Sequence, residues 1–110
     1  MTETSKTNER KGELIMIKKF IEKLLIDEQK RFEDIRVYIE DTRTELNFLN
    51  DRYRRDFKND DFVSFKKDLE HMNALADDIN EYIIDLRNSK KRIDIYRKLL
   101  GLFKKENEAV

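Results

Sequence analysis

The sequence predicts an all-α protein, a long antiparallel two-helix hairpin that resembles a coiled coil and dimerises into a four-helix bundle. Apolar residues recur at alternating steps of three and four along most of the chain, which is the spacing of a coiled-coil seam. The 110 residues include two glycines and no proline, so turns are few and helices are long. Charged residues make up 44% and apolar residues 38% of the chain, which leaves too little apolar material for a thick globular core.

A first helix is predicted over residues 12–57, after a polar tail at residues 1–11 that we expect to fray. Its later part carries a regular apolar seam, made by Phe32, Ile35, Ile39, Thr42, Leu46, Leu49 and Tyr53. The same stripe runs back through Glu28, Leu25, Ile21, Lys18 and Leu14. An alternative arrangement of three helices needs a break near residues 27–31, although no helix-breaking residue lies there.

The turn is predicted at residues 58–61, where Asn59 can end a helix in the left-handed conformation and Asp60 or Asp61 can cap the next one. The second helix then covers residues 62–105, and residues 106–110 form a second frayed tail. Its predicted seam consists of Phe62, Phe65, Leu69, Met72, Ala76, Ile79, Ile83, Leu86, Lys90 and Ile93. Together these elements form a single helical domain.

Composition also limits where the protein acts. The chain has no cysteine, which excludes disulfides and zinc–thiolate sites. Its first residues are polar, unlike a signal peptide, and lysines and a glutamate interrupt the apolar cluster at residues 14–26. We therefore expect a soluble, cytoplasmic protein. Isoleucine and asparagine are abundant relative to alanine, which favours an AT-rich coding sequence such as that of a virus, a mobile element or a low-GC bacterium.

The open end of the predicted hairpin has more apolar residues than one facing helix can cover. A helix that is apolar around much of its circumference normally packs among several others. The predicted protein interface consists of Ile15, Ile17, Phe20, Leu24, Leu99, Leu102 and Phe103. The favoured explanation is self-association, in which two hairpins form a four-helix core. A different protein partner and a third helix from the same chain are the alternatives.

Charge is segregated along the chain although the total is zero. Residues 1–31 carry eight basic and six acidic groups, residues 87–110 carry eight and three, and residues 32–86 carry eight and fifteen. A hairpin brings the two basic segments together at its open end, where they could attract phosphate or an anionic surface. The candidate anion-binding residues are Lys18, Lys19, Lys23, Lys90, Lys91, Arg92, Arg97 and Lys98. The simpler interpretation is a solvated basic face.

No motif predicts catalysis, a metal or a cofactor. The chain lacks a glycine-rich phosphate loop and a nucleophile elbow. Asp68 and His71 resemble half of a carboxylate-x-x-His metal motif, but the predicted seam places Asp68 at its edge and turns His71 away. We expect His71 to be an exposed surface residue, and we expect neither enzymatic activity nor a small-molecule substrate.

The sequence therefore predicts a non-enzymatic helical hairpin that self-associates and acts through protein–protein contact, as a small adaptor, assembly factor or inhibitor. The alternative is a protein that binds nucleic acid or an anionic surface through the basic open end of the hairpin. A net charge of zero disfavours nucleic acid as the partner. Contact with a membrane surface, through the basic and apolar residues at 92–105, is the weakest alternative.

Overall fold

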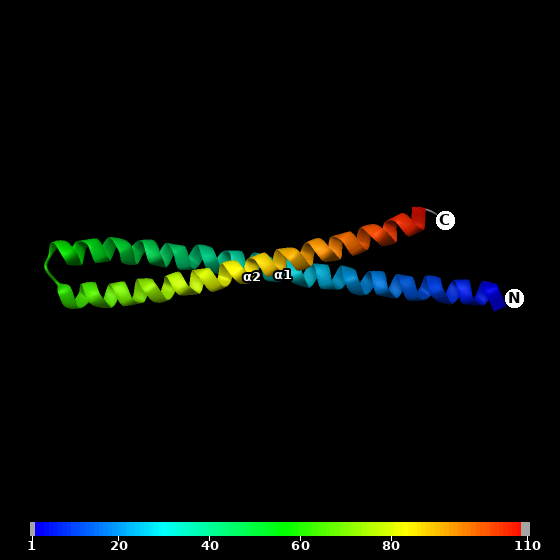
Figure 1. Cartoon of the computed structure of the whole chain (residues 1–110), viewed down its shortest axis with the longest axis horizontal. Coiled ribbons are helices and arrows are strands. Elements are labelled where there is room, and N and C mark those ends of the chain that lie inside the picture. The colour runs from blue at the N-terminus through cyan, green and yellow to red at the C-terminus, as the bar shows by residue number, and fades with distance from the viewer. Residues whose placement is uncertain (1, 109–110) are drawn as a thin grey trace. The chain divides into compact units, whose positions relative to one another are not determined.

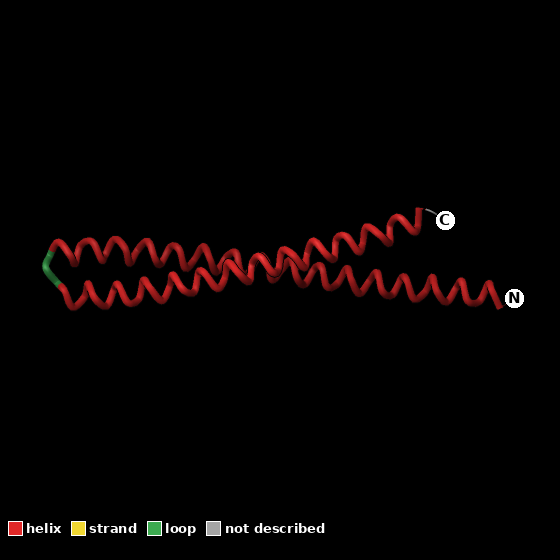
Figure 2. The backbone as a smooth tube through the Cα atoms, viewed as in Figure 1, coloured by secondary structure: helices red, strands yellow, loops and turns green. Residues whose placement is uncertain are grey.

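A computed structural model describes the backbone of residues 2–108 and the side chains of residues 9–104. It contains two α-helices, α1 (Thr2–Lys58) and α2 (Phe62–Glu108), joined by one short turn (Figure 1). Figure 2 shows the turn as the loop between the two helices, and the described residues contain no strand. The predicted all-α fold of two antiparallel helices is confirmed. No helix in the described part of the chain is long and apolar enough to cross a membrane.

Both helices extend further than the predicted bounds. The first was expected to begin at Gly12, but α1 begins at Thr2, so the described part of the predicted tail at residues 1–11 is helical. It continues without a break through residues 27–31, where the three-helix alternative needed one. The second was expected to end at residue 105, but α2 continues to Glu108. Residues 109 and 110 of the predicted C-terminal tail lie outside the described residues.

The turn joins two standard helix caps. The backbone N–H of Asp61 donates to the carbonyl of Asp56 (3.0 Å), and that of Asp60 donates to the carbonyl of Phe57 (3.3 Å). These two bonds form a Schellman motif, which requires a left-handed residue just after the helix. That residue is Asp60, with φ of 57°, and not Asn59 as predicted. The N–H of Ser64 donates to Asp61 Oδ1 (3.2 Å), so Asp61 caps α2 as expected.

The chain divides into two compact units, each built from a segment of both helices. Unit 1 pairs α1 up to Phe32 with α2 from Ser89 onward, and unit 2 comprises Glu33–Asn88. In unit 1 the buried or half-buried seam is made by Lys18, Ile21, Leu25, Glu28 and Phe32 of α1 and by Ser89, Ile93, Tyr96, Leu100 and Phe103 of α2. The seam positions of α1 in unit 1 are therefore those read from the sequence.

In unit 2 the structure confirms the α1 seam and corrects the α2 seam. The residues of α2 that face α1 are Phe65, Asp68, Met72, Leu75, Ile79, Tyr82 and Leu86. Half of the predicted positions are therefore displaced by one residue. The predicted seam residue Leu69 is 41% exposed, whereas its neighbour Asp68 is 2% exposed. The same correction applies to Phe62 and Ala76 of unit 2 and to Lys90 of unit 1, which were predicted to lie on the seam and are exposed.

Candidate protein-interaction surface

The seam divides the surface of each unit into two sides. An α-helix turns by about 100° per residue, so a residue directly before a seam residue and one directly after it flank the seam on opposite sides. In an antiparallel pair the two seams face each other and the two chains run in opposite directions. The residues that directly precede a seam residue therefore lie on the same side of the pair in both helices, and those that directly follow one lie on the other side. We name these the preceding side and the following side. Glu45 and His71 both precede a seam residue, and their Oε1 and Nε2 atoms lie 3.5 Å apart.

The preceding side of unit 1 carries an apolar patch drawn from both helices. Its six members each come directly before a seam residue: Ile17, Phe20, Leu24, Ile95, Leu99 and Leu102. Five of them are between 37% exposed (Leu99) and 61% exposed (Phe20), and Leu24 is half-buried. Monomeric proteins rarely expose contiguous apolar surface of this kind without a partner.

The register of unit 1 places the six residues of the apolar patch at three matching levels. Arg92 and Ser89 of α2 both hydrogen-bond to Glu28 of α1, which fixes how the two helices align. Each step toward the N-terminus of α1 then matches a step toward the C-terminus of α2. Leu24 accordingly lies at the level of Ile95, Phe20 at that of Leu99, and Ile17 at that of Leu102. The six residues therefore lie on one side of unit 1 at matching levels of the two helices.

Five of the seven predicted interface residues belong to the apolar patch. The other two do not: Ile15 follows the seam residue Leu14 and lies on the following side, and Phe103 is a half-buried seam residue. Ile95 belongs to the patch but was missing from the predicted set. Its position directly before Tyr96 would have identified it, had the seam been traced through Tyr96 and Leu100.

The seam itself opens toward the described ends of unit 1. Leu14 lies on the same stripe as Ile21, yet it is 40% exposed and Ile21 is 8% exposed. Figure 1 shows the two helices of unit 1 moving apart toward these ends. The covering of the seam within one chain is thus incomplete at Leu14, just beyond the outermost level of the apolar patch.

A polar layer bounds the apolar patch at its inner end. Glu28 is buried, and Arg92 holds its Oε1 through Nε (2.9 Å) and Nη2 (2.8 Å). Burial raises the pKa of Glu28, but the hydrogen bonds from Arg92 and Ser89 and the charge of Arg92 outweigh it, so the pKa lies below its ordinary value. Ser89 is fully buried and donates to the carbonyl of Glu28 (3.5 Å).

The predicted anion-binding residues do not form one site. Arg92 is engaged by Glu28, and Lys18 is half-buried on the seam. The remaining ones are exposed: Lys19, Lys23, Lys90, Lys91, Arg97 and Lys98. Lys19, Lys90 and Arg97 follow seam residues, so they lie on the following side, opposite the apolar patch. The other three occupy the outer faces of the helices.

Unit 2 contains a second polar layer that the sequence did not predict. Asp68, expected at the edge of the seam, is buried and accepts a hydrogen bond from Arg52 Nε to its Oδ1 (3.0 Å). Asp56 Oδ2 and Asp68 Oδ2 are buried without a hydrogen-bond partner among the described residues. The hydrogen bond from Arg52 lowers the pKa of Asp68. The pKa of Asp56 is raised, first because its protonated form can donate its proton to Asp68, and then because burial and the charge of Asp68 disfavour the anion.

His71 is exposed, as expected, and lies beside Glu45. Within the described residues, no three His, Cys, Asp or Glu side chains are grouped so that they could hold a metal ion. Comparisons give no further guide to the site, since the chain matches no family model, no curated protein and no solved structure.

Proposed function

We propose that this is a non-enzymatic, cytoplasmic helical-hairpin protein that self-associates through the apolar patch of unit 1 and acts by protein–protein contact. The roles that fit such a protein are those of a small adaptor, assembly factor or inhibitor. The observation that carries the proposal is the patch itself, with Ile17, Phe20 and Leu24 on α1 level with Leu102, Leu99 and Ile95 on α2.

The free energy available from covering the apolar patch is comparable to the cost of association. Fully burying a Leu, Ile or Phe side chain stabilises by about 1.5–3 kcal/mol, so covering the exposed half contributes about 1 kcal/mol. Two patches supply twelve such side chains and about 12 kcal/mol. Association costs about 4–15 kcal/mol in lost translational and rotational freedom. Burial of both patches therefore offsets most or all of that cost.

A second copy of the chain is the occupant that fits the apolar patch. The patch is two helices wide, and unit 1 of another copy presents a surface of the same width and composition. A twofold arrangement would place one patch on the other and build a four-helix core. The exposed lysines of unit 1 lie away from the patch, so this arrangement does not oppose two basic surfaces.

The proposal is tested by placing charges in the apolar patch. We expect the double variant Phe20→Glu, Leu102→Glu to have half the solution mass of the wild type or less by multi-angle light scattering. The reason is that each copy would have to bury two carboxylates in an apolar interface. Both side chains are exposed in the single chain, so helicity by circular dichroism should be almost unchanged.

The matched control makes the same change outside the apolar patch. Val37 and Ile84 are exposed apolar residues of unit 2, one on each helix. The variant Val37→Glu, Ile84→Glu should keep the wild-type mass. If the patch variant keeps the wild-type mass, or if both variants lose it equally, the patch is not the interface.

Binding of nucleic acid or of an anionic surface is the second candidate, because exposed basic residues gather on the following side and outer faces of unit 1. Salt separates the two candidates. Binding to phosphate weakens steeply between low and physiological salt, whereas an apolar interface responds little. We expect self-association to persist in high salt and binding to a duplex DNA probe to be weak at physiological salt.

A further inference from the structure

Unit 2 has an unpartnered apolar stripe on its following side. Phe62, Leu69, Ala76 and Ile83 recur every seven residues along α2, and we name them the heptad stripe. Sequence periodicity alone assigned them to the seam, but the structure seats the preceding residues Asp68, Leu75 and Tyr82 there instead. Phe62 is 61% and Leu69 41% exposed, Ala76 is exposed and Ile83 half-buried. A regular stripe of this kind is what a docked helix packs against.

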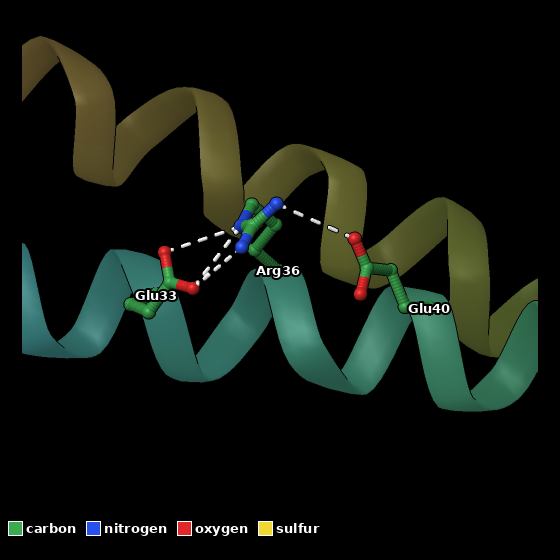
Figure 3. A network of polar contacts seen from close by, with 3 residues as sticks. All are labelled: Glu33, Arg36 and Glu40. Atoms are coloured by element: carbon green, nitrogen blue, oxygen red, sulfur yellow. Dashed lines mark hydrogen bonds and ion pairs between the residues drawn. The ribbon is translucent and has the colours of Figure 1, made fainter.

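Basic residues border the heptad stripe on both helices. The following side of unit 2 carries five basic residues, Arg36, Arg43, Arg54, Lys66 and Arg87, and two acidic residues, Glu33 and Glu40. Both acidic residues contact Arg36, with Nη2 to Glu33 Oε1 at 2.7 Å and Nη1 to Glu40 Oε1 at 3.4 Å (Figure 3). The other four basic side chains are exposed and have no ion pair within the described part of the chain.

The preceding side of the same unit has the opposite charge. Its acidic residues are Asp34, Asp41, Glu45, Asp78, Glu81 and Asp85, against the basic residues Arg52, Arg55 and Lys67. Arg52 is also bound to Asp68. The two sides of unit 2 therefore have net charges of opposite sign. Only the following side combines a net positive charge with an apolar stripe.

The turn end of the following side is also hollowed. Tyr53, Arg54, Phe57 and Lys58 line a shallow pocket on α1. Phe57 follows the seam residue Asp56 and lies at the level of Phe62, the first member of the heptad stripe. A hollow lined by two aromatic and two cationic side chains suits an apolar anchor residue followed by carboxylates.

We propose that the following side of unit 2 binds an acidic amphipathic α-helix from another protein. Its apolar residues, spaced by heptads, would pack on Phe62, Leu69, Ala76 and Ile83. Its flanking carboxylates would meet Arg43 and Arg54 on one edge and Lys66 and Arg87 on the other. None of these residues belongs to the apolar patch of unit 1, so the two proposals rest on different side chains.

The experiment uses the full chain and two synthetic helices of about 21 residues, or three heptads. Both probes have leucine on their seam; one has glutamate at the flanking positions and the other has lysine. By fluorescence anisotropy, the glutamate probe should bind and the lysine probe should not. Leu69→Glu should weaken binding of the glutamate probe at least about tenfold, and so should Arg43→Glu combined with Arg87→Glu.

Two controls keep the result specific. Ile84→Glu places the same charge on an exposed apolar residue of the outer face of α2 and should leave binding unchanged. The variant Phe20→Glu, Leu102→Glu should bind the glutamate probe as well as the wild type does, whatever its own solution mass. Equal binding of the two probes, or equal binding by Leu69→Glu and Ile84→Glu, would overturn the proposal. A change in solution mass caused by Leu69→Glu would also overturn it, because a second copy would then cover the stripe.

Discussion

At the scale of single residues, buried charges occupy seam positions that a coiled coil normally fills with apolar side chains. Glu28 is held by Arg92 in unit 1 and Asp68 by Arg52 in unit 2. In both cases the arginine comes from the opposite helix, so each pair fixes the alignment of its unit. Single polar residues on a seam commonly specify register at some cost in stability. Both pairs consist of a carboxylate and a guanidinium, which suits a directional hydrogen bond.

The carboxyl pair of unit 2 predicts a pH-dependent effect of Asp56→Asn. Because the pKa of Asp56 is raised by Asp68, the stabilisation that comes from protonating it is fully present below its ordinary value of about 3.8. That stabilisation is lost as pH rises through the raised pKa. An amide can donate to Asp68 Oδ2 at every pH, so Asp56→Asn should melt a few degrees above the wild type at neutral pH.

This difference should shrink as the pH falls through the raised pKa of Asp56 and be smallest below about 4, because wild-type Asp56 then carries its own proton. Thermal melts from about pH 3 to about pH 8, at one protein concentration, measure it. Asp51→Asn removes an exposed carboxylate from the same helix and serves as the control. A difference between Asp56→Asn and the wild type that stayed constant with pH would contradict the shared proton.

At the scale of the elements, sequence reasoning succeeded for the helices and α1 seam but not for half of the α2 seam. Both Leu69 and Asp68 continue a three-and-four spacing from Phe65, and hydrophobicity alone selects Leu69. The structure selects Asp68 because Arg52 can reach it from α1. The spacing of apolar residues in one sequence does not reveal that Arg52 and Asp68 pair across the turn. The same displacement created the heptad stripe, whereas Ile95 was missed because the predicted seam ended at Ile93.

The turn yields a prediction about Asp60. Its left-handed backbone costs an ordinary L-residue about 1–2 kcal/mol, and glycine adopts it without that cost. After allowing for the greater freedom of glycine in the unfolded chain, Asp60→Gly should stabilise the fold by about 0.5–1 kcal/mol. Chemical denaturation measures the change in the free energy of unfolding.

Asn59→Gly is the matched comparison, one residue away. Asn59 does not have a positive φ, so glycine gains nothing there and should stabilise less than Asp60→Gly or even destabilise. Greater stabilisation from Asn59→Gly would show that the left-handed position had been assigned to the wrong residue.

At the scale of the whole chain, apolar and charged surface is distributed differently over the two units. Unit 1 exposes an apolar patch on its preceding side and basic residues elsewhere. Unit 2 exposes an apolar stripe bordered by cations on its following side and acidic residues on its preceding side. The sequence predicted excess apolar surface at the open end, because periodic residues exceeded what one facing helix can cover. The observed seam was needed to determine which residues lie on the same side of the helix pair.

The central claim is that a second copy covers the apolar patch, and the most direct measurement is the solution mass of the wild-type chain. Light scattering on a sizing column, at low and at high salt, should give a dimer or a larger even-numbered oligomer in both conditions, because an apolar interface is hardly screened. A monomer in both conditions at all accessible concentrations would contradict self-association. An oligomer that dissociates in high salt would contradict an apolar interface and assign the contact to charge.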